Sequence, residues 1–138
     1  MIDYKKLVKE AYEAQKFAYA PYSHFTVGAA LLTKDGKIYH GCNIESATFS
    51  PTNCAERTAI FKAVSEGERD FVAIAIVGND VNTKIGEGEI CPPCGVCRQV
   101  MTEFCPADFE IVLAKGYDDF EVHTLAELVP LVSLPIKG

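Results

Sequence analysis

The spacing of apolar side chains divides the chain into alternating helical and extended segments. Residues 4–19 carry apolar side chains three and four positions apart, with lysine and glutamate between them. This pattern predicts an amphipathic helix that begins after Asp3 as N-cap and stops at Pro21. A continuous apolar run over residues 71–78 predicts a buried central strand. Further strands are expected over residues 27–33, 37–42, 109–114 and 118–123, and further helices over residues 54–65, 95–104 and from Thr124 to near Pro130.

The predicted order of elements, α-β-β-α-β-α-β-β-α, indicates an α/β fold. Helices that alternate with strands after an opening hairpin cover both faces of a sheet. We therefore expect a three-layer α/β/α sandwich with a central mixed sheet of about five strands. The 138 residues fit one domain, and no linker, repeat or low-complexity segment divides residues 1–138. Right-handed crossovers would bring the starts of the two middle helices to one end of the sheet.

Charge and hydropathy narrow the classes of partner. The chain has 19 acidic and 13 basic residues, for a net charge of −6, which argues against a nucleic-acid partner. Its longest apolar run is too short to span a bilayer, and charged residues interrupt the first twenty positions, unlike a secretory signal. We therefore expect no membrane partner and a cytoplasmic location.

Three of the six cysteines stand at the starts of the two middle helices. Clustered cysteines in a reducing compartment more often bind metal or take part in chemistry than form disulfides. Cys94 and Cys97 lie three positions apart in one first turn, so their sulfurs face the same side. Cys54 begins the other helix and can supply a third thiolate. Three protein ligands and one open position are typical of catalytic zinc, which predicts one Zn²⁺ per chain.

The other cysteines leave alternatives open. Cys91 precedes Cys94 by the same three positions that separate Cys94 from Cys97, so it competes as a zinc ligand. As a fourth ligand it would instead close the site, as in structural zinc sites. Cys42 and Cys105 are expected to be buried small apolar residues. The three histidines show no ligand spacing, and none is assigned to zinc.

Two charged residues follow Cys54 directly. The Glu56 carboxylate would lie near the ligands, where it could take a proton from water on the metal and pass it on. Three thiolates around Zn²⁺ carry a net negative charge. We expect Arg57 to offset it by donating hydrogen bonds to the ligand sulfurs.

These residues also form a known signature. Cys54-x-Glu56 followed by Pro93-Cys94-x-x-Cys97 resembles the motif of zinc-dependent nucleobase deaminases. The resemblance to the cytidine and deoxycytidylate deaminase family, in its short homotetrameric class, extends over roughly residues 4–130. It is carried in order by residues 20–32, 41–45, 54–59 and 93–100.

The resemblance implies a cytidine deaminase-like fold, a function and a set of roles. The function would be hydrolytic deamination of cytidine and deoxycytidine to uridine and deoxyuridine plus ammonia, in pyrimidine salvage. Glu56 would be the catalytic proton carrier, Phe25 would stack on the pyrimidine, and Ala55 would contact the substrate. Asn43 and Glu45 would bind the ribose hydroxyls. Active sites would be completed at subunit interfaces of a homotetramer.

Two positions depart from the family pattern. Relatives often carry an aromatic residue within the segment that is Val129–Ser133 here, and a tyrosine where this chain has Phe49. Both differences bear on substrate preference, and neither touches the zinc ligands. A deaminase of a cytosine nucleoside analogue, of the blasticidin-S type, is the nearest alternative. A structural zinc-binding module and an editor of polymeric RNA or DNA are more distant ones.

Overall fold

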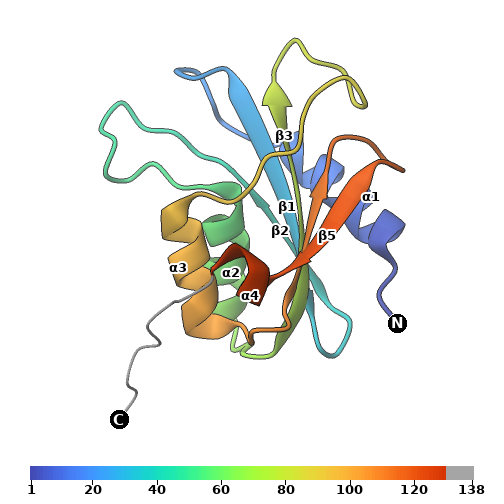
Figure 1. The fold of residues 1–138 in the computed structure, drawn as a ribbon. Helices are drawn as coiled ribbons and strands as arrows, with labels where there is room; N and C mark the ends of the chain where they lie inside the picture. The colour runs from blue at the N-terminus through green and yellow to red at the C-terminus, as the bar shows by residue number, and fades with distance from the viewer. Residues whose placement is uncertain (130–138) are drawn as a thin grey trace.

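A five-stranded sheet in the order β2-β1-β3-β4-β5 forms the centre of the computed structural model, which describes residues 1–129 (Figure 1). Strands β3 and β4 pair in parallel, and the other neighbouring strands pair antiparallel. The predicted mixed sheet is thereby confirmed. Along the chain the elements are α1 (Tyr4–Gln15), β1 (Phe25–Thr33), β2 (Ile38–Cys42), α2 (Ala55–Ser65), β3 (Phe71–Asp80), α3 (Gly95–Phe104), β4 (Glu110–Ala114), β5 (Phe120–Thr124) and α4 (Leu125–Leu128).

Helix α1 covers one face of the sheet. Asp3 caps it as predicted, because its side chain accepts a hydrogen bond from the Lys6 backbone N–H at 3.1 Å. Leu7 and Val8 are at most 1 % exposed, so each contributes roughly 1.5–3 kcal/mol through burial. The cluster on this face contains Leu7, Val8, Ala11, Tyr12, Ala30, Ala73, Ala75, Val77, Val112 and Ala114.

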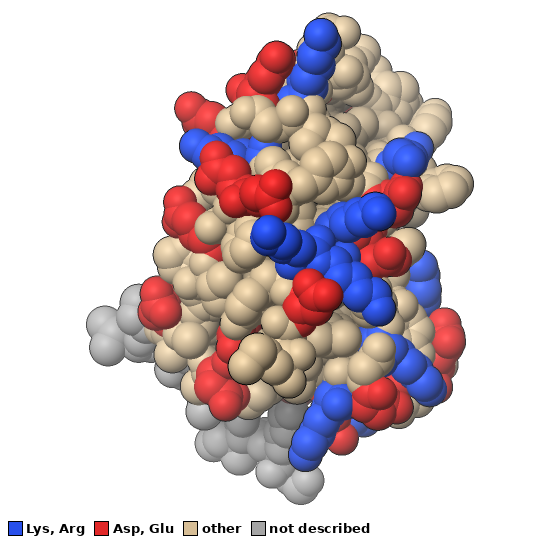
Figure 2. Space-filling view, turned by 90° about the vertical axis from the view of Figure 1, so that its right-hand side faces the viewer, with Lys and Arg blue, Asp and Glu red and all other residues tan. Residues whose placement is uncertain are grey.

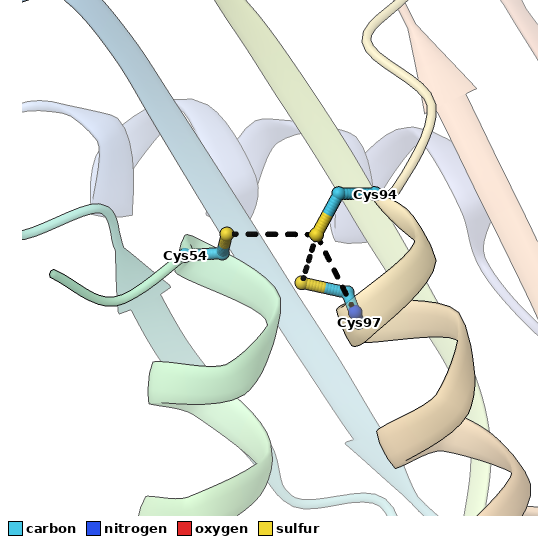
Figure 3. A group of neighbouring side chains, drawn as sticks. All are labelled: Cys54, Cys94 and Cys97. Atoms are coloured by element: carbon cyan, nitrogen blue, oxygen red, sulfur yellow. Dashed lines mark hydrogen bonds between the residues drawn. The ribbon is translucent and has the colours of Figure 1, made fainter. Parts of the chain in front are cut away.

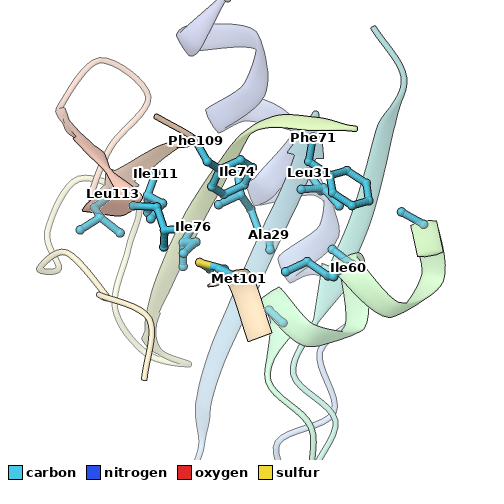
Figure 4. Close-up of a cluster of buried hydrophobic side chains, with 14 of the residues drawn as sticks. Ala29, Leu31, Ile60, Phe71, Ile74, Ile76, Met101, Phe109, Ile111 and Leu113 are labelled. Atoms are coloured by element: carbon cyan, nitrogen blue, oxygen red, sulfur yellow. The ribbon is translucent and has the colours of Figure 1, made fainter. Parts of the chain in front are cut away.

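Helices α2 and α3 cover the opposite face (Figures 1 and 4). Ile60 from α2 and Met101 from α3 are fully buried against the sheet residues Ile74 and Ile76. Leu125 of α4 belongs to the same cluster. The three-layer α/β/α sandwich predicted from the sequence is confirmed.

The sheet topology places the starts of α2 and α3 at the same end of the sheet. Strands β2 and β3 are both antiparallel to β1, so they run in the same direction and their C-terminal ends lie at the same end of the sheet. Helix α2 follows β2 along the chain, and α3 follows β3. Gly41 lets α2 lie directly on β2, because a methyl group there would be 2.2 Å from the Ala55 carbonyl oxygen. The first turn of α2 is therefore held at a fixed height above the sheet.

The first helix is shorter than predicted. It ends at Gln15, although the apolar pattern continues through Phe17 and Ala18. The backbone of Tyr19 instead bonds to the segment after β2, donating to the Asn43 carbonyl at 2.9 Å and accepting from the Glu45 N–H at 2.9 Å. These tertiary bonds override the local pattern, and Phe17 is left 79 % exposed. Helix α3 spans the predicted residues 95–104, and the remaining elements differ from prediction by one or two residues at their ends.

Within residues 1–129, no helix combines the length and the apolar character needed to cross a bilayer.

Candidate active site

Three cysteines from the starts of α2 and α3 form one cluster (Figure 3). Cys54 is the N-cap of α2, Cys94 is the N-cap of α3, and Cys97 lies in the first turn of α3. Their Sγ atoms all lie within 4.8 Å of one another. The Sγ atom of Cys94 is 3.8 Å from that of Cys54 and 3.3 Å from that of Cys97. Within residues 1–129, no fourth Cys, His, Asp or Glu belongs to this group.

The cluster fits a zinc ion. Thiolates about 2.3 Å from a tetrahedral Zn²⁺ lie about 3.8 Å from one another, close to the sulfur separations in this cluster. The positive ends of two helices meet at the sulfurs, which favours the thiolate form that zinc requires. Three ligands leave one tetrahedral position for water or substrate.

Arg57 supports the negative charge of the cluster. Its Nη2 donates to the Cys54 Sγ atom at 3.3 Å, as predicted from the sequence, and the Cys97 backbone N–H donates to the Cys94 Sγ atom at 3.4 Å. The Nε atom of Arg57 is buried and has no hydrogen-bond partner among the described residues. This cationic group beside the sulfurs suits an anionic metal centre.

The thiols of the cluster differ in proton affinity. A hydrogen bond from Cys97, together with the Arg57 guanidinium, lowers the pKa of Cys54 to about 5. The same bond to Cys54 and burial raise the pKa of Cys97. The Cys54 thiol therefore loses its proton more readily than the Cys97 thiol, which holds its proton. Binding of a divalent cation would release that proton.

Glu56 is a buried carboxyl group beside the ligands. Its residue is only 4 % exposed, and loss of solvation raises its pKa to about 7, with a further contribution from the charge on Cys54. A carboxyl group with this pKa can accept and release a proton near neutral pH. Its position in the first turn of α2 follows from its place two residues after the N-cap Cys54.

A cavity of about 310 Å³ opens onto the cluster, within the size range of small-molecule sites. Seven of the nine predicted site residues line it: Phe25, Asn43, Glu45, Cys54, Ala55, Glu56 and Cys94. Cys97 and Arg57 support the cluster without lining the cavity. The cavity is also lined by Cys91, the competing ligand candidate, and by residues that were not predicted from the sequence, which are Ser23, Val27, Thr52, Asn53 and Pro92.

Comparison with known proteins matches most of this chain to a family. The family model for the cytidine and deoxycytidylate deaminase zinc-binding region matches residues 1–113. The chain belongs to this family. A cytidine deaminase of Halalkalibacterium halodurans is 53 % identical over 129 residues, which are 94 % of this chain and 92 % of that protein. A blasticidin-S deaminase of Bacillus cereus is 34 % identical over 127 residues, 91 % of this chain and 89 % of that protein.

A solved structure shares the fold of this deaminase chain. The crystal structure of a cytidine deaminase from Burkholderia pseudomallei superposes with a TM-score of 0.85 at 44 % identity, and the match covers 96 % of this chain and all of the other. The family resemblance and the fold predicted from the sequence are both confirmed. So is the zinc cofactor, because the family is zinc-binding and the three cysteines form a suitable ligand group.

Asn43 and Glu45 line the deaminase cavity and also bind the segment around Phe25, which lines the cavity as well. The Asn43 side chain accepts from the Val27 N–H and donates to the Phe25 carbonyl, both at 2.8 Å. The Glu45 carboxylate accepts from the N–H groups of Tyr22 and Ser23, both at 3.1 Å, and from the Ser23 hydroxyl. The two side chains therefore fix the backbone on both sides of Phe25. Taken alone, Glu45 resembles an ordinary turn residue, and only the family resemblance assigned it a role; its partner Ser23 lies in the matching segment 20–32 but was assigned no role.

The remaining cysteines are outside the ligand group. Cys91 lines the cavity, and burial raises the pKa of its thiol to about 11. Among the described residues, the group that could hold a metal ion consists of Cys54, Cys94 and Cys97, which supports these ligands over Cys91. Cys105 packs against the core, and burial raises its pKa to about 12. Cys42 is half-buried.

A second cavity, lined by Phe49, adjoins the first. It measures about 410 Å³ and shares Ser23, Glu45 and Thr52 with the first cavity. The Phe49 side chain, which stands where relatives often have tyrosine, is 89 % exposed at its rim. The other departure from the family pattern falls mainly on residues 130–133, which lie outside the described residues.

Proposed function

We propose that this chain catalyses the hydrolytic deamination of cytidine and deoxycytidine to uridine and deoxyuridine, with release of ammonia. The observation that carries the proposal is the single cavity that brings together Phe25, the buried Glu56 carboxyl group and the ligand sulfurs of Cys54 and Cys94. An aromatic ring, a proton carrier and a metal position are the parts that this reaction needs.

The metal ligands and Glu56 have different roles in the proposed reaction. The three thiolates would hold zinc, which would supply an activated water for attack at C4 of the pyrimidine. Glu56 takes a proton from that water and gives it to N3 of the ring. Glu56 then takes the proton of the new C4 hydroxyl group and supplies it to the amine as the C4–N4 bond breaks, which leaves a carbonyl group at C4. Water is consumed, ammonia leaves, and Glu56 returns to its starting state. In the metal-free chain, burial raises the pKa of this carboxyl group to about 7.

The surrounding groups hold the substrate and balance the charge. Phe25 stacks on the base, Ala55 contacts it, and the free hydrogen-bonding capacity of Asn43 and Glu45 serves the ribose hydroxyls. Arg57 offsets the negative charge of the thiolates through its bond to Cys54. This offset keeps the metal a stronger Lewis acid than three thiolates alone would allow.

The charges around the cavity favour a nucleoside over a nucleotide. Among the described residues, the cavity and its two neighbours are lined by the carboxylates Glu45, Glu56, Asp80 and Glu89, and by no lysine or arginine. A 5′-phosphate bound here would face like charge without a cationic partner. We therefore place cytidine and deoxycytidine ahead of deoxycytidylate as substrates.

Two other functions receive less support. A structural zinc module would use a fourth protein ligand, and residues 1–129 add none to the cluster. An editor of polymeric RNA or DNA would need a basic surface. Figure 2 instead shows acidic and basic side chains interspersed over the side that carries α1 and β5, and the net charge is −6.

The test is an ultraviolet absorbance assay of the zinc-loaded protein with cytidine, deoxycytidine, deoxycytidylate and blasticidin S. We expect turnover of the two nucleosides and little of the nucleotide. Glu56→Gln removes the proton carrier and preserves the shape, so kcat should fall at least 10³-fold, in about the range of general acid–base catalysis, with zinc retained. Near-normal turnover in Glu56→Gln would contradict the mechanism. Turnover of blasticidin S alone would move the assignment to the analogue deaminase.

Assembly and cellular role complete the proposal. Several exposed large apolar side chains line the two adjoining cavities, among them Tyr22, Phe25 and Phe49. Exposed apolar groups of this kind are typical of surfaces that a partner covers. We infer that the chain, as a single domain over residues 1–138, forms a homotetramer whose subunits complete one another's sites. Its setting would be cytoplasmic pyrimidine salvage.

A further inference from the structure

The guanidinium group of Arg98 joins two backbone segments that are distant in the sequence. Its Nε donates to the Pro93 carbonyl oxygen at 3.0 Å, and its Nη1 donates to the Leu128 carbonyl oxygen at 3.0 Å. Pro93 directly precedes the ligand Cys94, and Leu128 is the last residue of α4. One side chain therefore connects the metal-binding segment to a separate element of the fold.

Arg98 also holds the backbone on both sides of Cys94. While its side chain bonds to the carbonyl before Cys94, its own backbone N–H bonds to the Cys94 carbonyl at 2.9 Å. The preceding residues Pro92 and Pro93 have no N–H with which to anchor this segment. The Pro93 carbonyl also lies outside the hydrogen-bond ladder of α3, which begins at its N-cap. The guanidinium is thus a principal constraint on the position of the Cys94 sulfur.

The other end of the connection is firmly placed. The backbone N–H of Leu125 donates to the Phe109 carbonyl at 2.8 Å, and that of Ala126 donates to the Ala107 carbonyl at 3.0 Å. The Leu125 side chain is only 3 % exposed within the core. A capping box between Thr124 and Glu127 begins α4. The Leu128 carbonyl is therefore a fixed point against which Arg98 can hold the ligand segment.

We propose that Arg98 is a positioning residue for the metal ligand Cys94 and sets how long the chain retains zinc. It does not line the cavity, so it acts through the ligand segment and not through the substrate. The planar guanidinium presents donors in a rigid fork, which suits two carbonyls on different elements. The inference rests on the proposed function only through the shared zinc site.

The experiment compares zinc release from the loaded wild type, Arg98→Met and Arg69→Met into a chromophoric chelator. Methionine keeps an apolar stem and removes the donors. Arg69 is the matched control, because its Nη1 also donates to two backbone carbonyls, Val64 at 2.9 Å and Glu68 at 2.7 Å, at the opposite end of α2. We expect release about 10-fold faster from Arg98→Met, the lower end for groups that orient metal ligands, and a wild-type rate from Arg69→Met.

A spectroscopic readout and a conservative variant separate positioning from general stability. In the Co²⁺-substituted proteins, the sulfur-to-metal charge-transfer bands should shift in Arg98→Met and stay unchanged in Arg69→Met. Arg98→Lys keeps the charge and can make one of the two bonds, so its release rate should be intermediate; it also decides the question if Arg98→Met does not fold. Wild-type release and spectra in the Arg98 variants, or equal acceleration in Arg69→Met, would overturn the proposal. Metal release requires no turnover, so this result is independent of the deaminase assay.

Discussion

Replacing Gly41 with alanine should displace helix α2 and with it a zinc ligand. The added methyl group would lie 2.2 Å from the Ala55 carbonyl oxygen and 2.6 Å from the Ala59 nitrogen. Ordinary contacts of a carbon atom are about 3.5 Å, so the helix must retreat by about 1 Å. Cys54 begins this helix, and its Sγ atom is 3.8 Å from that of Cys94. A shift of about 1 Å therefore distorts a ligand set that zinc requires at about 3.8 Å spacing.

The expected cost has two parts. Forcing a methyl group against backbone atoms destabilises a packed core by about 1–3 kcal/mol, and a contact this short belongs at the upper end of that range. Misplacing a ligand should weaken zinc binding by roughly 10–100-fold, as loss of supporting groups does. Denaturant unfolding measures the first effect, and competition with a chelator of known affinity measures the second.

Gly95→Ala is the matched control for the added methyl group. Gly95 begins α3 beside Cys94, yet an added methyl group there meets no heavy atom within 4 Å. Alanine in a helix should, if anything, stabilise by up to about 1 kcal/mol. If Gly41→Ala matched Gly95→Ala in zinc affinity and in unfolding midpoint, the close contact between β2 and α2 would not position the site.

Two further predictions concern the metal and pH. Cys97→Ala should lose zinc while Cys91→Ala keeps it, because the Cys97 sulfur belongs to the ligand group and the Cys91 sulfur does not; metal analysis of both variants would show the reverse if the assignment were wrong. In zinc-free protein, burial raises the pKa of Glu56 from 4.5 to about 7, so the folded chain binds more protons than the unfolded chain in this interval. The Glu56 contribution to stability is then fully present below about pH 4.5 and decreases by about 3 kcal/mol as pH rises through 7. Unfolding of zinc-free wild type and Glu56→Gln at about pH 5 and about pH 8 should show the variant gaining relative stability at the higher pH, and a constant difference would contradict the raised pKa.

The zinc ligands could be predicted because their signal is local. Cys94 and Cys97 share one helical turn, and Cys54 begins a helix that the topology brings to the same edge. Zinc chemistry restricts the residue types, and helix geometry restricts the spacing. The layers of the fold were predictable for a similar reason, since helical and extended periodicities differ along the whole chain.

The parts that escaped prediction depend on contacts between distant segments. The end of α1 is set by backbone hydrogen bonds between Tyr19 and the segment after β2. The spacing of apolar residues does not indicate these hydrogen bonds. Asn43 both binds the backbone of β1 and lines the cavity. This double role can be predicted only when β1 is known to lie beside Asn43. Gly41 is conspicuous only once α2 is placed upon it. Such features arise from tertiary packing and cannot be read from local preference.

Cys54 begins α2 as its N-cap without making a side-chain hydrogen bond to the helix. Serine, threonine, aspartate or asparagine at such a position would commonly add about 1 kcal/mol by satisfying a free backbone N–H. Stability and metal binding therefore select different residues at this one position, a local trade-off between a robust fold and a working site. A stabilisation programme that improved helix caps without regard to the metal would count Cys54 among its first targets and would remove a zinc ligand.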